Sequence, residues 1–259
     1  MTACVQTSAP CELLPWDSDF FQCRIGRVRG DVLDRAQAEA IAEWSRAERV
    51  RCLYFLARAD CPGTVETAQA NGFGLVDIRV TLQRPLGGPQ DPRRFQPSSD
   101  VVIRPFRADD LPTLEALAEA CHTDTRFFSD PHFPRPLAKA LYSTWIRRDC
   151  QGRAQQVLVA DTGARPALGY VSCQVHSAAD AGQIGLLGVS PEARGKGLAK
   201  SLVQSALGWL EAQGAREVTV VTQGRNVPAQ RLYQGCGFRT RDVRLWYHKW
   251  FPEGRGEHA

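Results

Sequence analysis

The sequence lacks any apolar run close to the roughly 20 residues that a membrane-spanning helix needs, so we expect no contact with a membrane interior. Its first ten residues, MTACVQTSAP, also lack the basic and apolar segments of a secretory signal. Together these absences predict a cytoplasmic protein.

Closely spaced cysteines are missing as well. Nine cysteines, an odd number, are spread along the chain without a C-x-x-C pair. Neither cysteine nor histidine recurs at the spacing of a metal-ligand set. We therefore expect reduced thiols and no bound metal.

The chain has little excess of charge of either sign. Its 32 basic and 28 acidic residues give a net charge of +4 at pH 7, and the basic residues are scattered rather than gathered in a stripe. This argues against a nucleic-acid partner. Hydrophobic residues at 43% and charged residues at 23% are typical of a soluble globular protein. A length of 259 residues favours two domains, or one domain with a large extension.

What the sequence does contain is a basic, glycine-rich stretch at 183–199, QIGLLGVSPEARGKGLA. It predicts a short apolar strand over 184–189, a turn with a proline, and a long helix opened by Arg194, Gly195, Lys196, Gly197, Leu198 and Ala199. Glycine lets a ligand approach the backbone closely, and the first N–H groups of a helix attract anions. The stretch therefore predicts a diphosphate site, with an ordinary solvated turn as the alternative. Its spacing fits neither a Rossmann fingerprint nor a P-loop.

A second motif, NVPAQRLYQGCGF, runs from Asn226 to Phe238 and follows a strand predicted over 217–222. The pair R-x-x-G-x-A and N-x-x-A-x-x-L-Y-x-x-x-G-F resembles the GCN5-related N-acetyltransferases, the GNAT family. The resemblance implies an α/β (α+β) fold whose mixed, mostly antiparallel central sheet is flanked by helices. It also implies acetyl-CoA as co-substrate, without a metal.

The same resemblance assigns roles to residues. The glycine-rich loop would hold the pyrophosphate of acetyl-CoA, and Leu187, Gly188 and Val189 would run along its pantetheine arm. The amide near Leu187 would polarise the thioester carbonyl. Asn226 would contact the pantetheine, and Tyr233 would protonate the departing CoA thiolate.

The Pro-rich stretch 85–100 is predicted to link two domains. We expect a small α/β domain over 1–84, the acetyltransferase domain over 101–250 and a disordered tail over 251–259. In the first domain the patterns predict strands at 22–28, 52–57 and 75–82 and helices at 35–49 and 64–71. In the second they predict strands at 101–105, 155–161 and 169–175 and helices at 111–121, 137–148 and from 194 onward.

A weak internal repeat lays Gly72–Arg79 over Gly237–Arg244, with Gly, Phe, Asp and Arg in common. It suggests that the first domain is a degenerate second copy of half a GNAT fold, although a helix–Gly-Phe–strand joint is also a generic feature. No phosphate loop precedes it at 57–63, so such a copy would have no CoA site. The apolar end of the last predicted strand, 243–248, offers a route to a homodimer.

The acceptor is expected at 122–136, HTDTRFFSDPHFPRP, in which an aromatic ring could stack on a base and an arginine could hold a phosphate. The candidate residues are Arg126, Phe127, Phe128, Asp130 and His132. A packed aromatic loop is the alternative.

A closer resemblance narrows the acceptor. The segments PWDSDFF, RFFSDPHF, LYSTWIRR and IGLLGV resemble one branch of the family, the TDP-fucosamine N-acetyltransferases, over nearly the whole chain. That branch acetylates the amino group of a TDP-linked 4-amino-4,6-dideoxyhexose for surface polysaccharide, although its linker is shorter. The implied acceptor is thus a nucleotide-linked aminodeoxysugar. The alternative acceptor is a peptide or ribosomal-protein N-terminus, or a small amine. A third possibility is a module that binds acyl-CoA without catalysis. Tyr233 argues against it, because binding alone does not need a proton donor.

The attacking amine must lose a proton, yet the strand IGLLGV carries no carboxylate to accept it. A water chain, His132 or Asp130 is expected to serve instead. The histidines His122, His176 and His248 are interpreted as surface or strand residues.

Overall fold

The computed structural model describes residues 9–87, 101–163, 166–176 and 180–252. It contains two compact units, one formed by residues 1–79 with 243–259 and the other by residues 80–242. Most of the predicted linker (88–100) and of the predicted tail (253–259) lies outside the described residues. Within the described ranges no helix is long and apolar enough to span a membrane.

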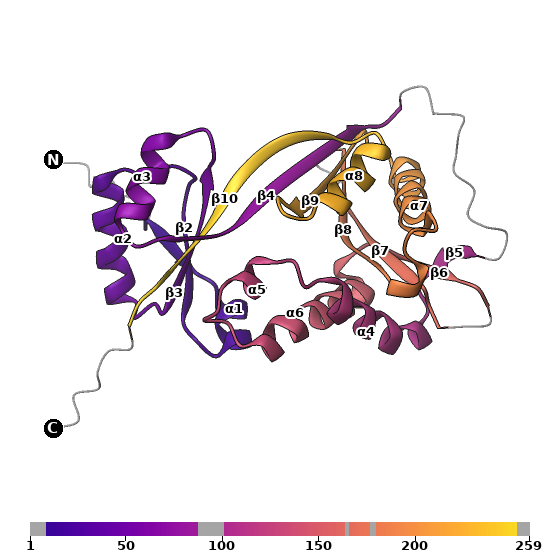
Figure 1. The fold of residues 1–259 in the computed structure, drawn as a ribbon, viewed down its shortest axis with the longest axis horizontal. Coiled ribbons are helices and arrows are strands. Elements are labelled where there is room, and N and C mark those ends of the chain that lie inside the picture. Colours follow the sequence, from indigo (N-terminus) through magenta and orange to yellow (C-terminus); the bar gives the residue numbers. More distant parts are fainter. Residues whose placement is uncertain (1–8, 88–100, 164–165, 177–179, 253–259) are drawn as a thin grey trace, which may run out of the picture. The chain divides into compact units, whose positions relative to one another are not determined.

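The first unit alternates strands and helices (Figure 1). Its elements are β1 (Cys11–Leu13), α1 (Pro15–Phe21), β2 (Ile25–Val28), α2 (Arg35–Ala47), β3 (Cys52–Arg58), α3 (Pro62–Ala70), the start of β4 (Gly74–Pro85) and the end of β10 (Arg239–Trp250). Helix α2 begins where it does because the Asp34 carboxylate accepts the N–H of Gln37 at 2.8 Å, while the Gln37 side chain accepts the N–H of Asp34 at 2.9 Å.

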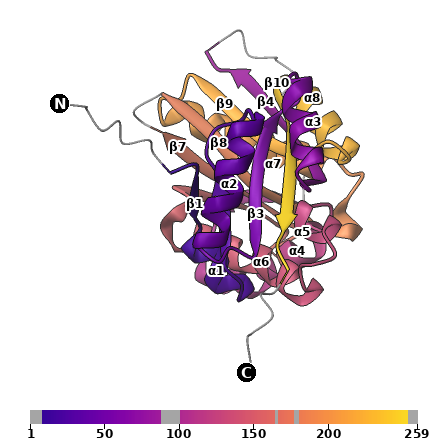
Figure 2. The same ribbon diagram turned by 90° about the vertical axis from the view of Figure 1, so that its left-hand side faces the viewer.

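The sheet of the first unit runs β1, β2, β3, β10, β4. Strands β2 and β3 are parallel, and β3 is antiparallel to β10, which lies beside it in Figure 2. The rings of Phe55 on β3 and Tyr247 on β10 lie 6.3 Å apart in the core of this unit. Because β10 has β3 on one edge and β4 on the other, residues 243–248 present no free edge to a second copy. The expected route to a homodimer through this strand is therefore wrong.

The second unit carries both sequence motifs. Its elements are β5 (Val102–Pro105), η1 (Ala108–Asp110), α4 (Leu111–Cys121), α5 (Arg126–Ser129), α6 (Arg135–Arg148), η2 (Asp149–Arg153), β6 (Gln156–Asp161), β7 (Gly169–His176), β8 (Ala181–Val189), η4 (Pro191–Ala193), α7 (Leu198–Ala212), β9 (Glu217–Gln223) and α8 (Val227–Gly235), together with the rest of β4 and β10.

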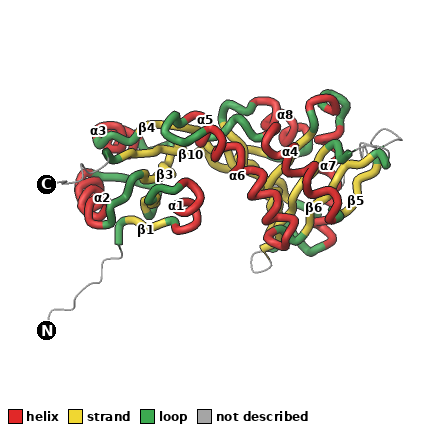
Figure 3. Tube along the Cα trace, turned by 90° about the horizontal axis from the view of Figure 1, so that it is seen from below, coloured by secondary structure: helices red, strands yellow, loops and turns green. Residues whose placement is uncertain are grey.

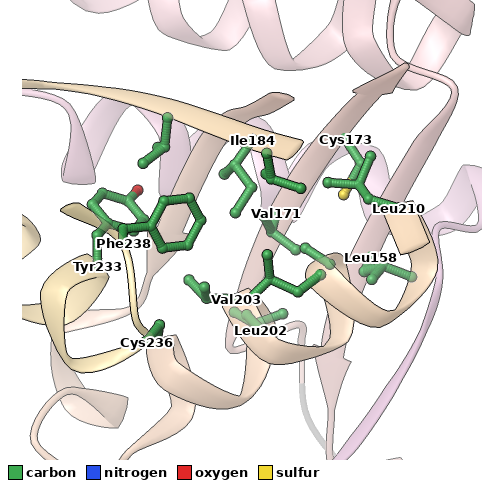
Figure 4. Packing of buried hydrophobic residues seen from close by; sticks show 14 of the residues in the cluster. Leu158, Val171, Cys173, Ile184, Leu202, Val203, Leu210, Tyr233, Cys236 and Phe238 are labelled. Atoms are coloured by element: carbon green, nitrogen blue, oxygen red, sulfur yellow. The ribbon is translucent and has the colours of Figure 1, made fainter. Parts of the chain in front are cut away.

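The sheet of the second unit is mixed and mostly antiparallel, as predicted. Strands β5 to β8 pair antiparallel in chain order, and β8 pairs parallel with β9. Helix α7 covers one face, where Leu202 and Leu210 join the core cluster of Val171 and Cys173 (Figure 4). Helices α4 and α6 lie side by side (Figure 3) and cover the other face, toward which Tyr170 and Ser172 of β7 point.

The structure contains a much longer repeat than the sequence suggested. Adding 165 to the first and last residue numbers of β3, α3 and β4 gives the first and last residue numbers of β9, α8 and β10. The two helix ends match in detail. Gly72 and Gly237 have φ of +77° and +85°, and the N–H of Phe73 and Phe238 donates at 3.0 Å to the carbonyl of the residue five positions earlier. This is the geometry that two copies of one half-fold would share.

The copies exchange their last strands. Strand β10, which ends the second copy, pairs with β3 of the first, and β4, which ends the first copy, lies next to β9. Val80 and Leu82 of β4 accordingly belong to the core of the second unit, and Tyr247 of β10 to that of the first. The compact units therefore differ from the predicted 1–84 and 101–250, because two long strands each continue from one unit into the other.

Candidate active site

The site begins where two parallel strands stop pairing. Strands β8 and β9 pair from Ala181 and Glu217 as far as Ile184 and Val220. Strand β8 continues to Val189, so its last residues extend beyond the pairing with β9. Unpaired backbone N–H and C=O groups on such an edge can bind an extended ligand.

A β-bulge lies at the same point of β8. Strand β7 pairs Val171 with Leu187 and Cys173 with Ile184, so that Gly185 and Leu186 together oppose a single β7 residue. The N–H of Leu186 donates to the hydroxyl of Ser172 at 2.8 Å.

Glycine is required in this segment for packing. A Cβ atom on Gly188 would lie 2.6 Å from the Tyr170 ring, so only glycine lets that ring lie against β8.

The glycine-rich loop follows β8 directly. Gly195 and Gly197 have φ of +74° and +80°, a left-handed conformation that glycine adopts without steric cost. Gly197 caps α7, whose first N–H groups have no acceptor within the helix. The Arg194 guanidinium turns back to the Val189 carbonyl at 3.2 Å, whereas Lys196 is exposed. Two left-handed glycines, a helix N-terminus and an exposed lysine suit a pyrophosphate.

Tyr233 lies on α8 and belongs to the core cluster of the second unit. Its side chain is only 5% exposed, and its ring packs edge-on to that of Phe238 at 5.8 Å (Figure 4). Burial raises the pKa of the Tyr233 phenol above its ordinary value, so the group carries its proton at neutral pH. Leu187 and Ala199 border the same cluster. The structure thus brings the tyrosine, the end of β8 and the start of α7 together around one core.

Asn226 caps the helix that carries Tyr233. Its Oδ1 accepts the N–H of Ala229 at 3.1 Å. The cap occupies the amide oxygen and leaves the amide NH₂ group as the part of the side chain able to donate to a ligand.

The candidate acceptor loop contains a short helix, α5. Phe127 is 2% exposed and packs edge-on to Phe133 at 5.3 Å, with the Arg126 guanidinium over its ring at 4.5 Å. The neighbouring Phe128 is more exposed than Phe127. Asp130 is buried, and its Oδ1 lies 2.8 Å from Nδ1 of His132, whose side chain is 57% exposed.

Sequence reasoning missed a polar cluster between α4, α6 and β7. His122 caps the end of α4, its Nε2 lies 3.0 Å from the Tyr170 hydroxyl, and its ring stacks on Tyr142 at 4.8 Å. Burial lowers the pKa of His122 to about 4. This half-buried histidine at the end of a helix is therefore neutral at pH 7, whereas we expected a surface or strand residue. The available signal was the alternation along β7, in which Tyr170, Ser172 and Gln174 share one face and the apolar Val171, Cys173 and Val175 share the other.

Asp149, just after α6, was missed as well. It is 3% exposed, and burial raises the pKa of its carboxyl group even though Ser172 hydrogen-bonds it. Among the described residues no group of three or more His, Cys, Asp or Glu side chains could hold a metal ion.

Comparison with known families agrees with this geometry. Residues 115–238 match the acetyltransferase (GNAT) family. Among solved structures, the GCN5-related N-acetyltransferase from Sphaerobacter thermophilus has the same fold, with a TM-score of 0.66 at 21% identity over 94% of this chain and 77% of that one.

Three relatives extend the comparison. The dTDP-fucosamine acetyltransferase of Escherichia coli O6:H1 is 29% identical over 245 residues, 93% of this chain and 98% of that protein. The spore coat polysaccharide biosynthesis protein SpsD of Bacillus subtilis is 34% identical over 148 residues, 57% of this chain and 50% of that protein. The mycothiol acetyltransferase of Geodermatophilus obscurus is 27% identical over 206 residues, 74% of this chain and 62% of that protein.

The fold, the glycine-rich loop and these relatives define an acyl-CoA-dependent transferase of amino groups. Residues 115–238 are a domain of the acetyltransferase (GNAT) family, and the protein is an N-acetyltransferase.

Proposed function

We propose that this enzyme acetylates the amino group of a nucleotide-linked aminodeoxysugar, of the TDP-4-amino-4,6-dideoxyhexose type, in the cytoplasm. The observation that carries the proposal is the match to the dTDP-fucosamine acetyltransferase along 93% of this chain and 98% of the relative. The matched region therefore includes residues of both compact units. The match to SpsD, named for polysaccharide biosynthesis, supports the same class of acceptor.

Acetyl-CoA would lie along the open end of β8. The loop residues Arg194 to Gly197 and the first N–H groups of α7, from Leu198 and Ala199, would bind its pyrophosphate. Leu187 to Val189 and the amide of Asn226 would hold the pantetheine. No metal is required, because backbone N–H groups and cationic side chains supply the positive potential.

Transfer would proceed by direct attack. The N–H of Leu187 donates to the thioester oxygen and stabilises the negative charge that develops there. The amine nitrogen forms the new C–N bond, the C–S bond breaks, and Tyr233 gives its proton to the CoA sulfur. The amine proton leaves through water or the Asp130–His132 pair, and Tyr233 regains a proton from solvent.

The acceptor would bind beside α5. Phe128, as the more open ring, suits stacking on the base, and the guanidinium of Arg126 suits the diphosphate. Phe127 supports this surface from beneath, because its ring is packed in the core.

A second candidate is a small-molecule amine other than a nucleotide sugar. The match to a mycothiol acetyltransferase over 74% of this chain favours it. The two candidates share the acetyl-CoA site and differ only in the acceptor.

A turnover assay that measures release of the CoA thiol separates them. The acceptors are TDP-4-amino-4,6-dideoxygalactose, its glucose epimer, and a panel of plain amines and peptides. We expect turnover with a TDP-aminosugar alone, and an increase of about tenfold in its KM in Arg126→Gln, the loss of one charged phosphate contact. The matched control is Lys139→Gln, which removes an exposed cation from α6. Turnover of plain amines alone would establish the second candidate.

A further inference from the structure

The bulge in β8 is held by a side chain. In a regular antiparallel pair the N–H of Leu186 would bond to a backbone carbonyl, but here it donates to the Ser172 hydroxyl at 2.8 Å. A hydroxyl can accept one hydrogen bond and donate another at the same time. Ser172 is fully buried, and its hydroxyl bonds the Asp149 carboxylate. A chain of hydrogen bonds therefore joins Asp149, Ser172 and the bulge.

The space around this chain is closely fitted. A Cβ atom on Gly185 would lie 2.6 Å from the Ser172 hydroxyl oxygen and 3.8 Å from Oδ2 of Asp149. Glycine at 185 thus leaves the room that the serine needs to reach the bulge.

Asp149 is an unusual residue for this position. Among the described residues its Oδ1 is buried without a hydrogen bond, and the Arg153 guanidinium lies 3.9 Å from that oxygen. Burying a carboxylate with so few partners costs stability. A contribution to function is a better account of this residue than a contribution to folding.

The direction of the neighbouring amide follows from strand geometry. Successive N–H groups of an extended strand point to opposite edges. With the N–H of Leu186 fixed on the β7 side, that of Leu187 points to the β9 side, where pairing has already ended at Ile184 and Val220.

We propose that Asp149 and Ser172 are positioning residues that fix the β8 bulge, and thereby aim the Leu187 amide at the thioester carbonyl of acetyl-CoA. This inference rests on the proposed binding of acetyl-CoA along β8, but it does not depend on which amine is the acceptor.

The test compares two ligands that differ at one group. Free CoA lacks the thioester carbonyl, so the ratio of its Kd to that of acetyl-CoA reports the amide contact, and titration calorimetry measures both. We expect Ser172→Ala and Asp149→Leu to lower this ratio by about threefold to tenfold, the contribution of one hydrogen bond. Asp149→Asn, which keeps an oxygen acceptor for Ser172, should retain most of the ratio. The infrared C=O stretch of bound ¹³C-labelled acetyl-CoA should shift toward its value in water in the first two variants only.

Ser143→Ala is the matched control. Ser143 is a buried serine of α6 that bonds Glu119 at 2.7 Å on the same side of the sheet. It should change the melting temperature without changing the ratio. Equal ratios in Ser172→Ala and Ser143→Ala would overturn the proposal, as would equal losses in Asp149→Asn and Asp149→Leu, because the asparagine keeps an oxygen acceptor for Ser172. Failure to bind either CoA compound would overturn the acetyl-CoA site itself, whereas normal ratios without sugar turnover would overturn only the acceptor.

Discussion

Tyr233 occupies a position that suits a proton donor. The phenol is enclosed by apolar side chains of α8 and the strand that follows it, and burial raises its pKa. The phenol therefore keeps its proton in the resting enzyme, as a general acid must until the leaving group develops negative charge beside it. Tyr233 could be singled out in the sequence because its motif is local.

Removing that proton should slow the reaction without weakening cofactor binding. We expect Tyr233→Phe to lower kcat by about 10² to 10⁴, the range of general acid catalysis, with the Kd of acetyl-CoA changed less than twofold. Stopped-flow turnover and calorimetry measure the two quantities. Phe238→Leu, which alters the packing of the same ring but keeps the phenol, is the control. Unaltered kcat in Tyr233→Phe would remove it from the mechanism.

His122 should make the stability of the folded protein depend on pH. Its pKa is about 4 in the folded protein against an ordinary value of 6.5, so between these values the unfolded chain binds a proton that the folded chain does not. Stability that is present above pH 6.5 should therefore fall as the pH drops toward 4, by on the order of 3 kcal/mol in total.

Denaturant unfolding between pH 4 and 7 measures this slope. His122→Phe keeps an aromatic ring on Tyr142 and has no titrating group, so its free energy of unfolding should depend less on pH over that range. A slope identical to that of the unmodified protein would show that other groups are responsible.

Residues such as His122 and Asp149 could not be predicted from the sequence. Each lies at the end of a helix, and its role depends on contact with Tyr170 or Ser172, which lie on a strand more than 20 residues away in the sequence. The local pattern of apolar residues predicts which face of a helix or strand is buried, but it does not predict which side chains of other elements contact that face.

The helices and strands were mostly predictable because their apolar spacing is regular. The glycine-rich loop was also predictable in place, but its counterpart in the first unit was not. The 165-residue shift places 194–199, RGKGLA, over 29–34, RGDVLD, and not over 57–63, the segment in which such a loop would have been expected. Gly30 keeps a left-handed φ of +83°, but Asp31 replaces the lysine and pairs with Arg244 at 3.0 Å.

These two loops provide a matched pair of variants. A Cβ atom on Gly195 or on Gly30 would meet no atom of the described residues within 4 Å, so each alanine substitution costs mainly backbone strain, roughly 1 to 2 kcal/mol. We expect both to lower the melting temperature, but only Gly195→Ala to weaken acetyl-CoA binding, by about tenfold. Thermal shift with and without acetyl-CoA measures both effects. Weaker binding in Gly30→Ala would contradict the view that the first copy has no CoA site.

At the scale of the whole molecule, strand exchange decides which pieces of the chain can fold. The sequence predicts two domains but not the exchange of strands, because pairing between strands far apart in the sequence leaves no local pattern. Residues 101–250 lack Val80 and Leu82, which are buried in the second unit. Each such loss costs a few kcal/mol.

We therefore expect residues 101–250 alone to unfold without a cooperative transition, whereas residues 80–242 should unfold cooperatively. Circular dichroism during heating distinguishes the two outcomes. A sharp transition in the 101–250 piece would show that β4 is dispensable for the second unit.

The exchange also sets an order in time. When β3 leaves the ribosome, its partner on β10 has not been made, since Arg58 and its pairing partner Arg244 lie 244 − 58 = 186 residues apart in the sequence. At about 5 to 20 residues per second, the apolar strand Cys52–Arg58 remains without this partner for roughly 9 to 40 seconds. The N-terminal half of this enzyme is therefore the last part to be completed, and nascent chains that stall before residue 243 should be the ones that chaperones retain.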